Sequence, residues 1–262
     1  MLSSWSDLTT EEFADLAGEH GLAVLVLGAI EQHGPHLPLD TDLCIGEGLC
    51  RAMASHLPER IRALQLPSLA IGASQEHASF PGTLSLPPET AIGVIEAIGE
   101  RCAASGLQRL MLLNAHGGNH GVMEVAALNL RRRFGMLVVK ASYMRLPPPD
   151  GLLAARELSE GLHGGQAETA MMLHLDPGRV RQDRMEHFEM RPEVASDDAL
   201  FGAAGRAAWA WMAEDLNPAG VVGRADLATA DLGRRLVEHY GRQLAEVLAR
   251  AEALPWPPGR DE

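Results

Sequence analysis

The sequence has few cysteines and few basic residues for its length. Three cysteines, Cys44, Cys50 and Cys102, occur in 262 residues without paired spacing, so neither a disulfide framework nor a CxxC zinc knuckle is indicated. Lys and Arg total 22 against 35 Asp and Glu, giving a formal net charge of -13. Such a charge repels phosphate backbones and anionic lipids. We therefore expect no nucleic-acid partner.

Long apolar runs are also missing. No stretch approaches the roughly 18 apolar residues of a membrane span. The first residues, MLSSWSDLTTEEFADL, contain no basic region followed by an apolar one, as an export signal would. These absences favour a soluble protein in the cytoplasm with no membrane partner.

What is present is enough apolar sequence for a large core. Hydrophobic residues make up 46% of the chain, and the length suits one large α/β domain or two small ones. We find no internal repeat and no low-complexity linker. The sequence therefore predicts a single domain over residues 1–262.

Apolar runs alternate with segments of helical periodicity. The expected strands are AVLVLGA at 23–29, RLMLLN at 109–114 and MLVVKAS from Met136. The expected helices are about 43–56, 89–104, 119–134 and 225–253, with a further docked helix around Trp209 and Trp211. Alternation of this kind predicts an α/β fold, with a mostly parallel sheet flanked by helices.

Polar side chains with metal-binding chemistry follow two of the expected strands. The stretch EQHGPHLPLDTD, residues 31–42, places three carboxylates and two imidazoles directly after the first strand. His116, in NAHGGNH, follows RLMLLN. If these strands are parallel neighbours, Glu31, His33 and His116 meet at the carboxyl edge of the sheet, where α/β folds build their sites.

Carboxylates and imidazoles together form the ligand set for zinc, manganese or iron, and Asp42 can supply a carboxylate that bridges two ions. A bend at Gly34 and Pro35 would let Glu31 and His33 face one site. The later tract HGGQAET adds His163 and Glu168, with Glu168 near the start of a helix. Unpaired acidic groups in a cleft are costly, and a divalent ion offsets that cost.

Each part of this pattern has an alternative interpretation. Asp42 could cap a helix at Leu43, and His116 could be a hydrogen-bonded histidine in a glycine turn. Glu76 and His77, in an expected loop before FPGT, could shape the substrate side or be purely structural. His36 could orient a ligand or face solvent.

Five motifs in chain order resemble the creatininase family of amidohydrolases. They are EQHGPHLPLDTD, FPGTLSL after QEHAS, NAHGGNH, HGGQAETAMML and NPAGVVGRADLATADLG. The resemblance implies a Rossmann-like α/β subunit that assembles into hexamers, with two divalent ions, Zn, Mn or Fe(II), at the carboxyl edge of the sheet. It places Glu31, His33, Asp42 and His116 at ligand positions, with Asp42 bridging, and His163 at the histidine that shuttles protons.

The match departs from creatininase proper at one ligand. There a glutamate lies two residues after the motif histidine, where this chain has Gly118; Glu168 is our candidate replacement, as in the NGHGGN-type members that this chain resembles. The aromatic and acidic residues that enclose creatinine are replaced here by Ser159, Leu162 and Ala167. We therefore expect a substrate other than creatinine, held by polar contacts or by a neighbouring subunit.

The expected activity is hydrolysis of a carbon–nitrogen bond in a small amide, cyclic amide or formamide. A hydroxide shared by the two ions would attack, with His163 and Glu168 as the catalytic residues and His163 protonating the leaving nitrogen. One alternative is a creatininase-like peptidase that matures a peptide-derived redox cofactor. Others are a metal-stabilised binding module without turnover and a dinuclear phosphatase, for which no P-loop or basic clamp is found.

Overall fold

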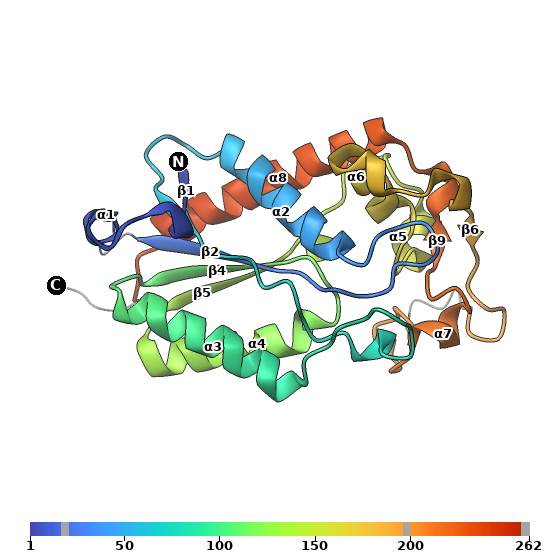
Figure 1. The fold of residues 1–262 in the computed structure, drawn as a ribbon, viewed down its shortest axis with the longest axis horizontal. Coiled ribbons are helices and arrows are strands. Elements are labelled where there is room, and N and C mark those ends of the chain that lie inside the picture. Colours follow the sequence, from blue (N-terminus) through green and yellow to red (C-terminus); the bar gives the residue numbers. More distant parts are fainter. Residues whose placement is uncertain (17–20, 196–199, 258–262) are drawn as a thin grey trace.

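The computed structural model describes residues 1–16, 21–195 and 200–257, and a five-stranded parallel sheet lies at its centre (Figure 1). The strand order is β1-β3-β2-β4-β5. The strands are β1 Leu2–Ser4, β2 Leu22–Leu27, β3 Ala63–Gln65, β4 Arg109–Asn114 and β5 Leu137–Ser142. β2 and β4 pair in parallel from Leu22↔Arg109 to Leu27↔Asn114. The predicted neighbouring strands are thereby confirmed.

Helices cover both faces of this sheet (Figure 1). On one face lie α2 Thr41–Ser55, α6 Gln166–Leu175 and α8 Ala230–Ala253. On the other lie α3 Pro88–Ala104 and α4 Asn119–Phe134. β2 is buried throughout, and its alternate residues divide between the two cores, with Val24 facing one and Leu25 the other. The continuous apolar run of this strand follows from burial on both sides.

The remaining elements are short. They are α1 Thr10–Leu16, α5 Ala155–Glu160, α7 Ala213–Leu216, the strands β6 His187–Phe188, β7 Phe201–Gly202, β8 Ala207–Ala208 and β9 Gly223–Arg224, and 3-10 turns at Trp5–Asp7, Gln75–His77, Tyr143–Arg145, Pro177–Arg179, Gln182–Arg184 and Ala225–Leu227. β6 and β9 pair antiparallel, and β7 and β8 pair in parallel.

Local signals explain where the long helices begin and end. Pro88 opens α3, where a missing N–H costs nothing. Gly135, at φ +71°, closes α4 in the left-handed conformation, and its N–H donates to Arg131 O. The Thr229 hydroxyl accepts from Leu232 N at the start of α8. This cap starts the helix at Ala230, five residues later than the predicted Ala225.

The prediction of a helix around Trp209 and Trp211 is wrong, because helix α7 does not begin before Ala213. Ala207 N donates to Leu200 O, which draws this segment into the β7–β8 pair. Helix α7 begins only at Ala213, where Met212 N donates to the Asp215 carboxylate. These hydrogen bonds override the helical preference of the alanines.

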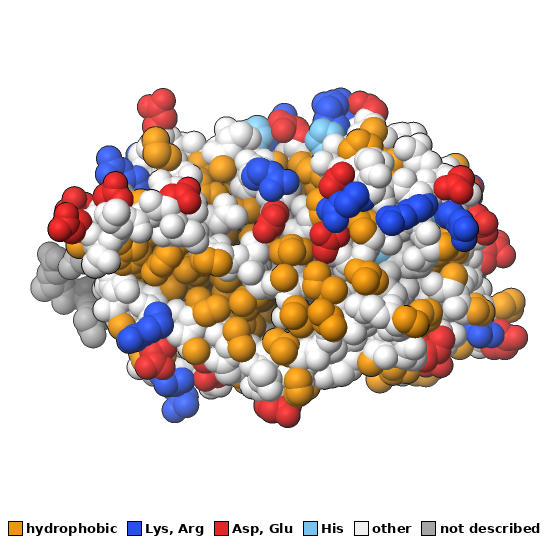
Figure 2. Space-filling model, viewed as in Figure 1, with side chains coloured by type: hydrophobic (Ala, Val, Ile, Leu, Met, Phe, Trp, Pro, Cys, Tyr) orange, Lys and Arg blue, Asp and Glu red, His pale blue; other side chains and the backbone are white. Residues whose placement is uncertain are grey.

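No helix among the described residues is long and apolar enough to cross a membrane. Hydrophobic side chains do gather across the middle of the face shown in Figure 2, over the segment that joins β3 to α3. In that segment Ile71 is 39% and Leu84 51% exposed. Charged side chains lie mostly around this apolar area.

Candidate metal centre

The predicted site residues meet at the carboxyl edge of the sheet, to the right in Figure 1. Glu31 and His33 follow β2, and His116 follows β4. Asp42 lies in the first turn of α2 and Glu168 in the first turn of α6. The first four are buried, and the Glu168 side chain is 13% exposed. The interpretation of Asp42 as a helix cap is wrong, because α2 begins at Thr41 with Asp40 at the cap position.

The five residues form two ligand groups that share Asp42. In the first, His116 Nδ1 lies 3.1 Å from Glu31 Oε1 and 3.3 Å from Asp42 Oδ2. In the second, His33 Nε2 lies 3.3 Å from Asp42 Oδ1 and 4.0 Å from Glu168 Oε2. Asp42 therefore turns one oxygen toward each group, as a bridging carboxylate does.

Several of these buried polar atoms have no hydrogen-bond partner among the described residues. They are both carboxylate oxygens of Glu31, Nε2 of His33 and Oδ2 of Asp42. Leaving such groups unpaired is costly, and native structures rarely do so. Carboxylate oxygens and imidazole nitrogens suit divalent zinc, manganese or iron. The residues present therefore fit divalent metal ions.

Backbone carbonyls aim three imidazoles at this centre. His33 Nδ1 lies 3.1 Å from Glu31 O, and His116 Nε2 lies 2.9 Å from Ala73 O. His163 Nε2 lies 2.7 Å from Gln32 O. Because a carbonyl oxygen only accepts, each of these nitrogens carries a hydrogen, and the other ring nitrogen faces the centre, where its lone pair is available once the ring is neutral.

The electrostatics favour charge separation within the cluster. Burial lowers the pKa of His33, but the charges of Asp42, Glu168 and Glu31 outweigh it and raise that pKa to about 9. Burial also lowers the pKa of His116, but the charges and hydrogen bonds of Glu31 and Asp42 outweigh it and raise that pKa well above its usual value. Burial raises the pKa of Glu168. A metal ion would therefore displace protons from these imidazoles when it binds.

His163 differs from His33 and His116, because its pKa is lowered and not raised. Its burial, assisted by the charge of His33, lowers its pKa to about 4, although Glu31 and Asp42 act in the opposite sense. Nδ1 of His163 faces Glu31 Oε1 at 3.7 Å. His163 is thus a neutral imidazole near neutral pH, with its lone pair directed into the centre.

Glu76 and His77 lie on the 3-10 turn Gln75–His77, where the sequence predicted a loop. His77 is buried, with Nε2 3.5 Å from Glu31 Oε1, and its ring stacks on His163 at a centroid distance of 4.2 Å. Glu76 Oε1 lies 3.7 Å from His116 Nε2. His77 therefore belongs to the cluster itself, a position that local sequence did not reveal.

His36 is buried, so it does not face solvent. Its Nε2 lies 2.9 Å from Thr169 Oγ1, and its ring stacks on Phe188. Thr169 directly follows Glu168 in α6, so His36 supports the helix turn that carries that carboxylate.

A cavity of about 400 Å³ opens above the cluster. Its polar floor includes Asp42, His116 and Glu168, and both Glu76 and His77 border it. Met144, Leu162 and Trp211 give it an apolar wall. Trp211 reaches the cavity from a distant segment, so one indole ring borders the site although the positions near the HGG tract carry Ser159, Leu162 and Ala167. Its indole N–H donates to Ala203 O at 3.2 Å.

The fold leaves no room for a glutamate at Gly118. A Cβ there would lie 2.3 Å from Ala73 O, 2.4 Å from Glu76 Oε1 and 2.5 Å from His116 Nε2. Glu168 reaches the same cluster from α6 instead.

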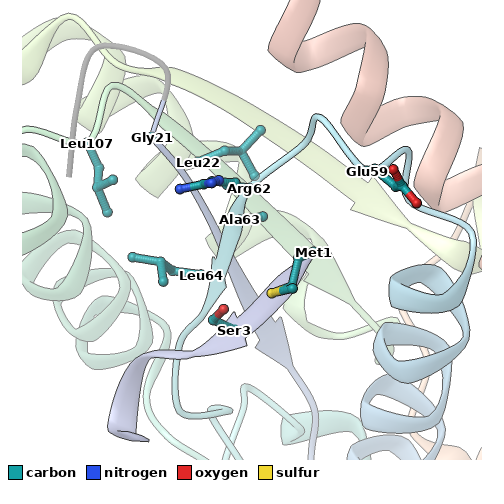
Figure 3. Close-up of a pocket in the computed structure, with 9 residues that line it drawn as sticks. All are labelled: Met1, Ser3, Gly21, Leu22, Glu59, Arg62, Ala63, Leu64 and Leu107. Atoms are coloured by element: carbon teal, nitrogen blue, oxygen red, sulfur yellow. The ribbon is translucent and has the colours of Figure 1, made fainter. Parts of the chain in front are cut away.

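A second cavity, of about 320 Å³, lies at the opposite, amino edge of the sheet (Figure 3). It is bordered by Leu22, Ala63 and Leu64 together with Arg62 and Glu59. Its described lining residues include one carboxylate and no imidazole. This cavity lacks the means to bind a metal ion and is separate from the cluster.

Comparisons with known proteins agree with this site. The family model Creatininase (creatinine amidohydrolase) matches residues 6–248. The mycofactocin precursor peptide peptidase of Mycobacterium ulcerans (strain Agy99) is 32% identical over 260 residues, 97% of this chain and 93% of that protein. The creatinine amidohydrolase of Pseudomonas putida is 34% identical over 197 residues, 68% of this chain and 74% of that one.

Solved structures agree as well. The structure named "Creatininase Mn" is 26% identical and superposes with a TM-score of 0.74, covering 98% of this chain and 100% of that chain. Sequence match, fold and the ligand groups at the sheet edge lead to one conclusion: the chain belongs to the creatininase family of metal-dependent amidohydrolases.

Proposed function

We propose that this chain hydrolyses a carbon–nitrogen bond of an amide substrate with two divalent ions at the carboxyl edge of the sheet. The observation that carries the proposal is Asp42, which turns one oxygen toward each of two ligand groups. Glu31, Asp42 and His116 would hold one ion, and His33, Asp42 and Glu168 the other. When bound, such ions lower the pKa of a shared water and polarise a carbonyl group.

His163 is the residue that moves the proton. Its Nε2–H is held by Gln32 O at 2.7 Å, so only Nδ1 can accept. Nδ1 would take a proton from the attacking water and deliver it to the amide nitrogen as the carbon–nitrogen bond breaks, leaving a carboxylate and a protonated nitrogen. The depressed pKa of His163, about 4, suits the uptake step because the ring is unprotonated at neutral pH.

Glu168 joins the metal centre to the HGG turn. Its Oε2 accepts from Gly164 N at 2.7 Å, next to His163. This hydrogen bond holds the carboxylate in place between the turn and the centre. Glu168 would thus act as a metal ligand and would also hold the turn that carries His163.

Glu76 and His77 are the substrate-side residues of the proposal. Both border the cavity, where a small amide, cyclic amide or formamide would enter. The apolar wall of Met144, Leu162 and Trp211 favours substrates with a hydrophobic group beside the reacting amide.

A second candidate is a peptidase that acts on a modified peptide. It is favoured by the likeness to the mycofactocin precursor peptide peptidase along 97% of this chain. A peptide end with an aromatic or aliphatic side chain would also suit the apolar wall. The two candidates share the metal centre and His163, and they differ in what the cavity admits.

The test compares metal-free and metal-loaded protein. Protein stripped with a chelator and reloaded with zinc or manganese is assayed for formation of the carboxylate product from formamides, cyclic amides, creatinine and short peptides. We expect hydrolysis in the loaded protein alone. Asp42→Ala should lose both ions and the activity, whereas His163→Ala should keep both ions and lose roughly hundredfold or more in kcat.

Three outcomes would contradict the proposal. Hydrolysis by metal-free protein would show that the reaction does not need the metal ions. Full metal content in Asp42→Ala would show that Asp42 does not bridge two ions. Full metal content without hydrolysis of any substrate would favour the binding module instead.

A further inference from the structure

Gln32 lies between His77 and His163 and hydrogen-bonds to each of them with a different group. Its side-chain nitrogen Nε2 is 2.9 Å from His77 Nδ1. Its backbone oxygen is 2.7 Å from His163 Nε2. Gln32 is 5% exposed, so water does not compete for these contacts. One residue therefore links two stacked imidazoles of the metal centre.

The orientation of the Gln32 amide is fixed by two backbone groups. Gly34 N–H donates to Oε1 at 2.9 Å, and Nε2 donates to Gly220 O at 2.6 Å. A flipped amide would face donor with donor and acceptor with acceptor, so the assignment is unambiguous. Gly220 also packs closely on this amide, because a Cβ there would lie 2.5 Å from Oε1. The late motif NPAGVVG thus delivers the carbonyl that holds Gln32.

This orientation determines the tautomer of His77. The amide nitrogen of Gln32 has hydrogens and no lone pair to offer, so His77 Nδ1 must accept. The hydrogen of the neutral His77 ring then lies on Nε2, which faces Glu31 Oε1 at 3.5 Å. His163 has the opposite arrangement toward the same oxygen, because its Nε2–H is bound to Gln32 O and its Nδ1 lone pair faces inward.

We propose that Gln32 is a positioning residue that makes His77 a hydrogen-bond donor and His163 a proton acceptor at the metal centre. The inference rests on the proposed function and assigns a role to each ring in it. With substrate in the cavity that His77 borders, its Nε2–H would donate to the substrate carbonyl oxygen as that oxygen becomes negative, in place of its 3.5 Å approach to Glu31 Oε1, while His163 Nδ1 would move the proton. Opposite tautomers on adjacent rings prevent both imidazoles from competing for one proton.

The first test is the tautomer of His77 in the wild-type, zinc-loaded protein. Long-range ¹H–¹⁵N correlation spectra of histidine-labelled protein distinguish Nε2–H from Nδ1–H, and the His77 signals are assigned by their loss in His77→Gln. We expect Nε2–H for His77. Because zinc is diamagnetic, the spectra remain sharp. This measurement depends neither on a Gln32 variant nor on activity.

Two variants then test the role of Gln32. Gln32→Glu keeps an oxygen that accepts from Gly34 N–H and replaces the amide nitrogen that donates to His77. A hydrogen bond between Glu at this position and His77 then requires a hydrogen on His77 Nδ1. Gln32→Met has similar length and no charge, and it removes both the donor and the oxygen that accepts from Gly34 N. We expect the His77 tautomer to switch in the first and to become mixed in the second. In both, kcat should fall about a hundredfold, with KM and zinc content close to wild type.

The matched control is Gln75→Glu. Gln75 is exposed on the same 3-10 turn, and its side-chain amide donates to Leu86 O at 3.1 Å. Gln75→Glu introduces the same charge change close to the site, and it should retain the His77 tautomer and the kcat of wild type.

The outcomes separate the inference from the proposed function. A hydrogen on Nδ1 of His77 in wild type would overturn the inference, as would an unchanged tautomer and kcat in Gln32→Met. Wild-type protein with the expected tautomer that hydrolyses no amide would overturn the proposed function and leave the tautomer assignment standing.

Discussion

Gly118 occupies a position where any side chain would collide with the supports of the metal centre. The nearest atom to an added Cβ is the backbone oxygen of Ala73, at 2.3 Å. This oxygen also accepts from His116 Nε2 and so holds Nδ1 of that ring toward Glu31. Since backbone yields less readily than a side-chain tip, we attribute the glycine to this crowding.

Gly118→Ala should therefore lower metal content and stability. We expect loss of bound metal together with about 1–3 kcal/mol of unfolding free energy, because the added methyl group must displace Ala73 or His116. The matched control is Gly117→Ala, since no described atom lies within 4 Å of a Cβ there. Elemental analysis and urea unfolding measure both variants, and equal metal content in the two would contradict this explanation.

His36 should give the protein a specific sensitivity to acid. Burial, with a smaller contribution from the charge of His33, lowers the pKa of His36 to about 4. The unfolded chain has a histidine pKa of about 6.5 and so binds more protons between pH 6.5 and 4. Stability from this group is full above pH 6.5 and is lost as the pH falls toward 4, by at most about 3 kcal/mol.

Urea unfolding of metal-free protein at pH 7 and pH 4.5 measures this effect. His36→Gln should lose less stability on acidification than wild type. The exposed His174 provides the control, because His174→Gln should keep the wild-type dependence. Parallel curves for wild type and His36→Gln would show that His36 titrates normally in the folded state.

Much of the centre could be predicted from local motifs, and part of it could not. Glu31, His33, Asp42, His116, His163 and Glu168 are recognisable because each motif contains ligand-type residues beside glycines. The positions of His77 and Trp211 depend on tertiary contacts. Gln32 and His77 are 45 residues apart, and no periodicity in the sequence relates them.

Helices α6 and α8 cross at very short range, and this contact positions Glu168. A Cβ on Gly233 of α8 would lie 1.8 Å from Ala170 O of α6. Ala170 is two residues after Glu168 in the same helix. The crossing therefore sets how far the Glu168 carboxylate extends toward His33.

Gly233→Ala should separate these helices and cost more than about 2 kcal/mol of unfolding free energy. It should also weaken metal binding at the group that contains Glu168. Gly93→Ala on the exposed face of α3 is the control, since no described atom lies within 4 Å of its Cβ. That variant should stabilise the protein by about 0.5–1 kcal/mol, because alanine is the better helix former. Similar stabilities for the two variants would contradict the tight crossing.

The elements were predictable in proportion to their length and burial. β4 and α4 have the predicted bounds, 109–114 and 119–134, because a buried strand and a capped amphipathic helix carry strong local patterns. β1 and β3 have three residues each, too few for a pattern to register. The helix predicted around Trp209 was wrong because strand pairing, and not the helical preference of alanine, decides the conformation of this segment.

For the whole molecule, parallel topology is what assembles the site. β2 and β4 lie side by side in register, so the segments that follow them meet at one edge. Helices α2 and α6 then add Asp42 and Glu168 from the same face of the sheet. A single domain, a cytoplasmic location and a homo-oligomer stay predictions.

The most direct test of the dinuclear centre is the metal content per subunit of wild type and Glu168→Gln. Both proteins are loaded with zinc, dialysed and measured by elemental analysis. Glu160→Gln, which changes a carboxylate paired with Arg156, is the control. We predict two ions in wild type and in the control, and about one in Glu168→Gln. One ion or none in wild type, or two retained in Glu168→Gln, would contradict a dinuclear site completed by Glu168.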